Sequence, residues 1–112
     1  MRVIDMYNMV YDSDIIKIRE TEEFARWFLR LRDEGAVARI VMRMTRIRTT
    51  GSVGDHRGVG DGVNEIRIDY GPGYRLYYSW RGNDLILLLA GGDKSSQRRD
   101  IERAKRLNRE YE

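Results

Sequence analysis

The chain has 112 residues, a formal net charge of +3 and no cysteine. This length predicts one domain spanning residues 1–112, and the missing thiols exclude disulfides, thiolate catalysis and cysteine zinc sites. The longest apolar run, residues 85–90, is far too short to cross a bilayer, and the N-terminus lacks the pattern of a signal peptide. We therefore expect a soluble cytoplasmic protein without a membrane partner.

The first half of the chain indicates a strand followed by two helices. Residues 1–13 are expected to form an N-terminal extension of uncertain character, and alternation predicts a strand near residues 14–19. Thr21 is a favourable N-cap for a helix over residues 21–33, which Gly35 is expected to end. A second helix is predicted from about 36 to 49. Apolar stripes at helical spacing support both helices: Phe24, Trp27, Phe28 and Leu31, then Val37, Ile40, Val41, Met44 and Ile47.

The second half indicates a loop and a β-hairpin. Residues 51–62 carry five glycines and the only histidine, His56, which predicts a loop. The run Gly71-Pro72-Gly73 favours a tight reversal between two strands, because proline presets one torsion and glycine accepts positive φ. Alternation then places Ile66, Ile68, Leu76 and Tyr78 on the core face, and Arg67, Arg75, Tyr77 and Arg81 on the other face.

The chain ends with a buried strand and a charged helix. Residues 85–90 are apolar without alternation, which predicts a central strand that Gly91 and Gly92 end. A last helix is expected from about 96 to 111, with Ile101, Ala104, Asn108 and Tyr111 on one side. The element order predicts an α+β fold: a mainly antiparallel sheet with an N-terminal helical hairpin on one face and a C-terminal helix.

Several short motifs in this order have counterparts in one known superfamily. They are Phe24-x-x-Trp27-x-x-x-Leu31, Ala36-x-Ala38-Arg39-Ile40, Gly54-Asp55-x-x-x-Val59-Gly60-x-Gly62-Val63-x-Glu65-x-Arg67, Tyr70-Gly71-Pro72-Gly73-Tyr74-Arg75, and Leu88-Leu89-x-Gly91-Gly92-x-Lys94-x-x-Gln97-x-x-Asp100-Ile101. Together they cover roughly residues 14–107. The chain resembles the RelE/ParE toxins of bacterial type II toxin–antitoxin modules, and within them the addiction-module killer proteins, which are HigB-like plasmid-stabilisation toxins.

The resemblance implies a partner and a target. The partner is a cognate antitoxin, expected to be a small helix-turn-helix DNA-binding protein. Many members of the superfamily cleave mRNA on the ribosome, using the RNA's own 2′-hydroxyl as nucleophile and no metal or cofactor. The ParE branch instead poisons DNA gyrase on the same fold, and a third possibility is a degenerate toxin that only binds its antitoxin. The fold alone does not decide among these targets.

The resemblance also assigns candidate site residues. Arg75 matches the arginine that stabilises the scissile phosphate, Arg67 matches a second basic position, and Lys94 matches a cation that follows the central strand. Tyr77 is a candidate to replace the tyrosine that the RNA-cleaving prototype has near the position of Asp100. His56 is a candidate general base because histidine is the residue type best suited to proton transfer near neutral pH.

Further residues are candidates for RNA contact or departures from the pattern. Arg57, Arg81 and Arg98 are expected to bind RNA. Glu65 stands where the prototype has a basic residue, and a general-base role is an alternative for it. A helical stripe formed by Arg39, Arg43 and Arg46 is either a solvated face or a contact with RNA or an acidic antitoxin segment.

Overall fold

The computed structural model describes residues 14–111, so the expected extension over residues 1–13 lies outside the described residues. The elements are β1 (Lys17–Glu20), α2 (Glu22–Arg30), α3 (Glu34–Thr50), β2 (His56–Gly60), β3 (Val63–Ile68), β4 (Tyr74–Trp80), β5 (Leu85–Asp93), the short 3₁₀ helix η1 (Lys94–Ser96) and α4 (Gln97–Glu110). The five strands form one sheet in the order β1-β5-β4-β3-β2. The β1–β5 pair is parallel and the other pairs are antiparallel.

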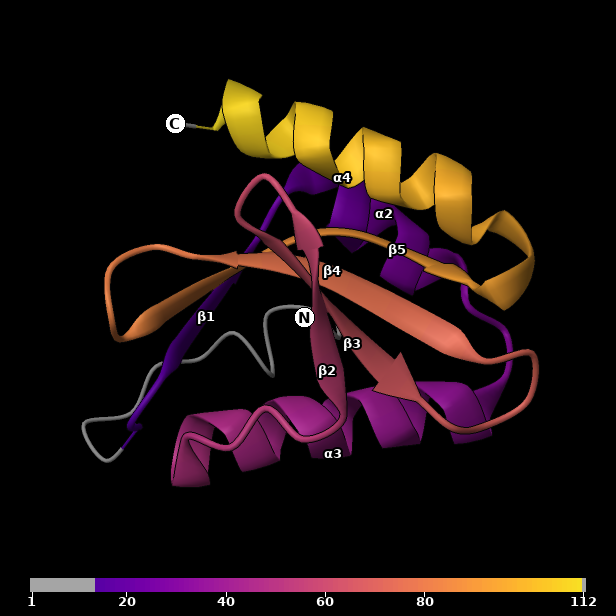
Figure 1. Cartoon of the computed structure of the whole chain (residues 1–112). Coiled ribbons are helices and arrows are strands. Elements are labelled where there is room, and N and C mark those ends of the chain that lie inside the picture. The colour runs from indigo at the N-terminus through magenta and orange to yellow at the C-terminus, as the bar shows by residue number, and fades with distance from the viewer. Residues whose placement is uncertain (1–13, 112) are drawn as a thin grey trace.

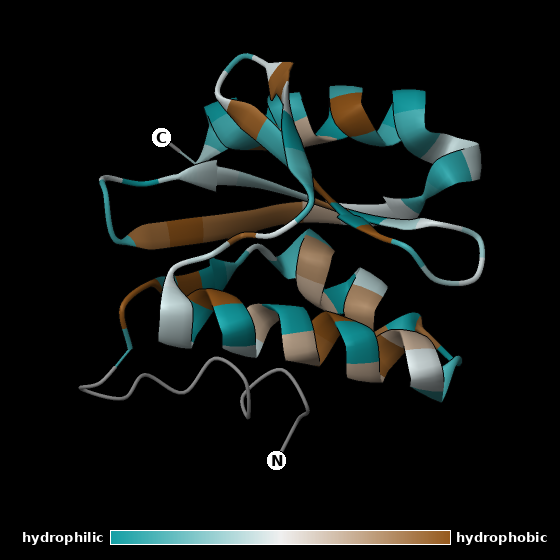
Figure 2. Ribbon diagram, turned by 60° about the horizontal axis from the view of Figure 1, so that its bottom comes forward, coloured by the Kyte–Doolittle hydropathy of each residue, from teal (hydrophilic) through white to brown (hydrophobic). Residues whose placement is uncertain are grey.

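The helices lie on both faces of this sheet. Figure 1 shows α4 above the sheet and α3 below it, and Figure 2 shows α2 in the same layer as α3. The expected α+β class is therefore confirmed. Within the described residues, no helix is both long and apolar enough to cross a membrane.

Side-chain caps define where the two N-terminal helices begin. Thr21 accepts a hydrogen bond from the backbone N–H of Phe24 at 3.1 Å, as the sequence predicts, and its hydroxyl donates to the Leu89 carbonyl at 2.7 Å. Asp33 caps α3 by accepting from the backbone N–H groups of Gly35 and Ala36. Gly35 therefore lies in the first turn of α3, and the expectation that it ends the preceding helix is wrong.

The segment expected to be a loop contains a strand. β2 pairs with β3, with Arg57 opposite Glu65, and its register shifts between Gly58 and Gly60. Glycine gives no alternating apolar pattern, so the sequence carries no strand signal here. The strand forms instead through backbone hydrogen bonds to β3, which do not depend on side chains.

The central strand is longer than the sequence predicts. β5 lies between β1 and β4, which confirms its central place, but it continues through Gly91 and Gly92 instead of ending there. A Cβ at Gly91 would overlap the ring of Trp27, and one at Gly92 would overlap the carboxylate of Asp100. These glycines therefore allow α2 and α4 to approach the strand closely.

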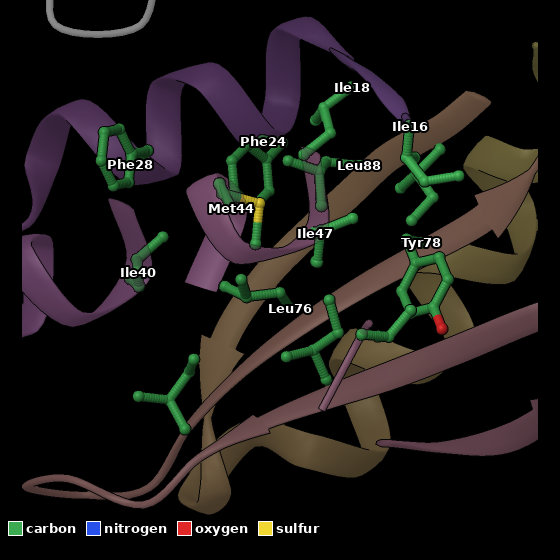
Figure 3. Close-up of a cluster of buried hydrophobic side chains, with 14 residues drawn as sticks. Ile16, Ile18, Phe24, Phe28, Ile40, Met44, Ile47, Leu76, Tyr78 and Leu88 are labelled. Atoms are coloured by element: carbon green, nitrogen blue, oxygen red, sulfur yellow. The ribbon is translucent and has the colours of Figure 1, made fainter. Parts of the chain in front are cut away.

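Two hydrophobic clusters fill the two sides of the sheet. The larger one packs α2 and α3 against the face that carries Ile66, Leu76 and Tyr78, and Figure 3 shows it. The smaller one packs α4 against Tyr77 and Leu89. This arrangement confirms the predicted alternation in the hairpin.

The side of α4 that faces the sheet differs from the prediction. Its buried residues are Asp100, Ala104 and Leu107, whereas Tyr111 is 45% exposed. Asp100 can be buried because its carboxylate accepts hydrogen bonds from Ser96 at 2.5 Å and Arg103 at 3.0 Å. The buried side of α4 therefore includes a charged residue, which a pattern of apolar residues does not reveal.

Candidate functional site

A pocket of about 340 Å³ opens beside the turn that joins β3 to β4. Its lining residues come from the residue before β2, from the β3–β4 hairpin and from the turn after β5. They are Asp55, Arg67, Ile68, Asp69, Gly71, Pro72, Gly73, Arg75 and Lys94. Three residues that the sequence singles out, Arg67, Arg75 and Lys94, therefore meet at one place. We call this place the cationic pocket.

Arg75 is held more firmly than a surface arginine. Its side chain is 12% exposed, and its Nη1 donates to the Tyr74 carbonyl at 3.0 Å. Its Nε is buried without a hydrogen-bond partner and lies 3.9 Å from Oε1 of Glu65. The inner side of the guanidinium is thus enclosed, while Gly73 of the turn lies close to its Nη atoms.

Arg67 stands directly opposite Arg75 in the β3–β4 ladder. Its Nε and Nη2 donate to Oδ1 of Asp55 at 3.1 and 2.7 Å, and its backbone N–H donates to the Asp55 carbonyl. Directly opposed side chains of an antiparallel pair point to the same face. Two donors of the Arg67 guanidinium are therefore already hydrogen-bonded to Asp55.

Lys94 reaches the pocket because η1 begins as soon as β5 ends. Asp93 caps this turn by accepting from the Ser95 N–H at 2.8 Å. A Cβ at Gly73 would lie 3.5 Å from Cβ of Lys94 and 3.4 Å from Nη1 of Arg75. With its φ of +81°, Gly73 lets the hairpin turn approach both cations.

The charges of the pocket favour an anion. Its lining contains three cations and two carboxylates, Asp55 and Asp69, so positive charge is in excess. Arginine presents a planar fork that matches phosphate oxygens, and lysine adds a point charge. The arrangement can therefore bind a phosphate group.

Tyr77 does not reach this pocket. Although the sequence places it on the same side as Arg75, its side chain is fully buried in the cluster under α4. Burial, together with the nearby negative charge of Glu65, raises the pKa of its phenol. Because α4 covers Tyr77, its side chain does not join Arg75 in the cationic pocket.

His56 is also directed away from the cationic pocket. It pairs with Ile66, whose side chain lies in the cluster under α2 and α3, so His56 occupies the opposite side of the sheet from Arg75. Its Nδ1 lies 2.7 Å from the Gly54 carbonyl oxygen. The sequence could not reveal this side, because the register of β2 decides it.

The three arginines expected to bind RNA have different surroundings. Arg57 is half-exposed and donates to Glu65 at 2.9 Å. Arg81 directly follows β4, and its guanidinium donates to Tyr111 and Asn108 at the C-terminal end of α4. Arg98 is exposed on α4 and does not line the cationic pocket.

The arginine stripe of α3 is only partly a solvated face. Arg43 donates to the carbonyls of Val53 and Arg67 at 3.3 and 3.1 Å, and Arg39 lies 4.1 Å from the centre of the Tyr70 ring. Arg39, Met42, Arg43, Arg46, Ile68 and Asp69 line a second pocket of about 440 Å³. We call it the α3 groove.

Two carboxylates of the cationic pocket have no counterpart among the sequence candidates. Asp55 follows Gly54, and Asp69 lies shortly before the Gly71-Pro72 turn. Aspartate is common beside such turns, so turn chemistry ordinarily explains it. Their position beside the arginines depends on the folded hairpin, so no local signal could have found them. Within residues 14–111, no group of three or more His, Asp or Glu side chains is arranged to hold a metal ion.

Comparison with known proteins identifies the fold first. The structure is similar to that of an arginine double mutant of the E. coli toxin RelE in its free state, with a TM-score of 0.60 and 12% sequence identity over 80% of this chain and 97% of that chain. The protein therefore has a RelE-like fold.

Its family is shown by sequence. The chain is 43% identical over 95 residues to an uncharacterized protein of Haemophilus influenzae, a match that covers 85% of this chain and 95% of that protein. The chain belongs to the same family as this protein. No protein-family model matches the chain.

Proposed function

We propose that this protein is the toxin of a type II toxin–antitoxin module and acts as a metal-independent, ribosome-associated mRNA endoribonuclease of the HigB-like, plasmid-stabilising kind. The observation that carries the proposal is the meeting of Arg67, Arg75 and Lys94 in one pocket of a RelE-like fold. Three cations around one pocket are suited to the charge that develops during phosphodiester cleavage.

The proposed reaction needs three functions from the pocket. The 2′-oxygen of the RNA forms a bond to phosphorus while the bond from phosphorus to the 5′-oxygen breaks. Asp69 takes the proton of the 2′-hydroxyl, and Lys94 gives a proton to the leaving 5′-oxygen. Arg75 stabilises the negative charge on the non-bridging phosphate oxygens, with support from Arg67.

An antitoxin completes the proposal. RelE-like folds suggest pairing with an antitoxin, which we expect to be a small helix-turn-helix DNA-binding protein. The α3 groove combines three arginines with the exposed Met42, so an acidic segment with apolar side chains fits its chemistry. Exposed cations such as Arg57 and Arg98 are suited to contact ribosomal RNA.

One observation favours a second candidate function, in which the protein binds DNA gyrase without cleaving RNA, as ParE-like toxins do. The lining of the cationic pocket includes no phenol or imidazole, since Tyr77 is buried and His56 lies on the other side of the sheet. A degenerate toxin that only binds its antitoxin is consistent with the same observation.

Expression of the protein with and without Arg75→Ala separates these candidates. The nuclease proposal predicts growth arrest, loss of translation and new mRNA 5′ ends for the wild type, and none of these for the variant. Inhibition of DNA supercoiling with intact mRNA would replace it with the gyrase function. Absence of growth arrest, with retained binding to the product of an adjacent small gene, would indicate a degenerate toxin.

A further inference from the structure

A buried carboxylate lies beside Arg75 of the cationic pocket. Glu65 in β3 is fully buried, and its two oxygens accept hydrogen bonds from different elements. Oε1 accepts from Nε of Arg57 in β2 at 2.9 Å, and Oε2 accepts from Nε2 of Gln97 at the start of α4 at 2.7 Å. Glu65 thus joins β2, β3 and α4 next to Arg75 of the cationic pocket.

This environment keeps Glu65 ionised. Burial by itself would raise its pKa, but the hydrogen bonds from Arg57 and Gln97, and the charge of Arg57, hold the pKa of the carboxyl below its ordinary value. A fixed negative charge therefore sits 3.9 Å from Nε of Arg75. Among the described residues, Nε of that arginine is buried and makes no hydrogen bond, so Glu65 is the charged group that faces it.

We propose that Glu65 is a positioning residue: its carboxylate holds the inner edge of the Arg75 guanidinium so that the outer nitrogens point into the cationic pocket. Only the catalytic consequence of this inference rests on the proposed function. The carboxylate also lowers the net positive charge near the pocket, so its two effects on RNA have opposite signs. It weakens simple electrostatic attraction and improves the orientation of the arginine.

A direct catalytic role does not fit the same observations. Both carboxylate oxygens are occupied, and the side chain has no exposed surface through which a 2′-hydroxyl could reach it. A role confined to the Arg57 pair does not explain the position of Arg75, whose Nε turns toward the buried carboxylate instead of toward solvent.

The first test measures the wild-type protein by ¹⁵N NMR of arginine side chains. The Nε–H signal of Arg75 should show slow solvent exchange and a rigid heteronuclear NOE, in contrast to the exposed Arg98 and Arg99 in the same spectrum. This measurement needs neither activity nor a variant. An Arg75 signal as mobile as that of Arg98 would overturn the proposal.

The second test removes the charge of Glu65. Glu65→Gln keeps the shape and a hydrogen-bonding network with a rotated Gln97 amide, and Glu65→Met provides an apolar variant if the first folds poorly. In a folded variant the Arg75 Nε–H should become mobile, and an unchanged signal would contradict the proposal. Far-UV circular dichroism and thermal unfolding verify the fold.

A double-mutant cycle then measures the coupling on RNA. Glu65→Gln should lower kcat about tenfold, within the range measured for residues in contact, without raising KM. In the Arg75→Ala background it should have no further effect on cleavage. An equal effect in both backgrounds would refute positioning through Arg75. If the wild type does not cleave RNA, the same cycle on binding of a short 2′-deoxy oligonucleotide, together with the NMR result, decides the inference separately from the nuclease proposal.

Discussion

Two neighbouring arginines of the cationic pocket should differ strongly in their importance for the proposed RNA cleavage. Arg75 lines the pocket and donates no hydrogen bond to a carboxylate, whereas Arg67 donates twice to Asp55. A phosphate must therefore compete with Asp55 for Arg67 but not for Arg75. The two arginines are directly opposite each other in the β3–β4 ladder, so the comparison between them is well matched.

The expected magnitudes follow from this difference. Removing one preorganised contact to a developing charge costs about 2.7–4 kcal/mol, so Arg75→Ala should lower kcat roughly 100- to 1,000-fold. Because Arg67 is already paired with Asp55, it interacts less strongly with a phosphate. Arg67→Ala should therefore lower kcat only about tenfold, which corresponds to about 1.4 kcal/mol.

The assay is single-turnover cleavage of a defined mRNA on purified ribosomes. Arg26→Ala on the exposed side of α2 removes the same charge from a residue that does not line the pocket and should leave the rate unchanged. Thermal unfolding should verify the fold of each variant. A loss for Arg67→Ala equal to or larger than that for Arg75→Ala would refute the reasoning. So would an Arg75→Ala rate equal to that of Arg26→Ala.

Three further predictions concern charge and packing. Asp55→Asn should free Arg67 and tighten binding of a short RNA about two- to fivefold, the worth of an exposed ion pair, in a Kd titration; weaker binding would oppose this. Gly92→Ala places a Cβ against a buried carboxylate and should cost about 1–3 kcal/mol in urea unfolding, while Gly58→Ala, which has room, should cost little. The ionised form of Glu65 is favoured in the folded state, so its stabilisation is present above its ordinary pKa of 4.5 and is lost as the pH falls below that value through the lower folded pKa. In Glu65→Gln the loss of stability at acid pH should be smaller than in the wild type, and an unchanged dependence of stability on pH would contradict this prediction.

The sequence alone determined the local features of the fold. The Thr21 cap and the alternation of Ile66 and Leu76 with Arg67 and Arg75 were predictable, because caps and a two-residue period depend on neighbouring residues only. The sequence also named Arg67, Arg75 and Lys94 as a group, through resemblance, and their catalytic roles stay predictions.

Tertiary structure alone decided which of these residues share a site. β2 exists because a glycine-rich backbone finds a partner in β3, and its register places His56 on the far side. Helix α4 covers Tyr77 and gives Glu65 its second hydrogen bond. The close approach of α4 to β5 depends on the missing side chain of Gly92. Contacts between elements far apart in sequence leave no periodic signal, so the cationic pocket and its buried carboxylate emerge only when the sheet and α4 come together.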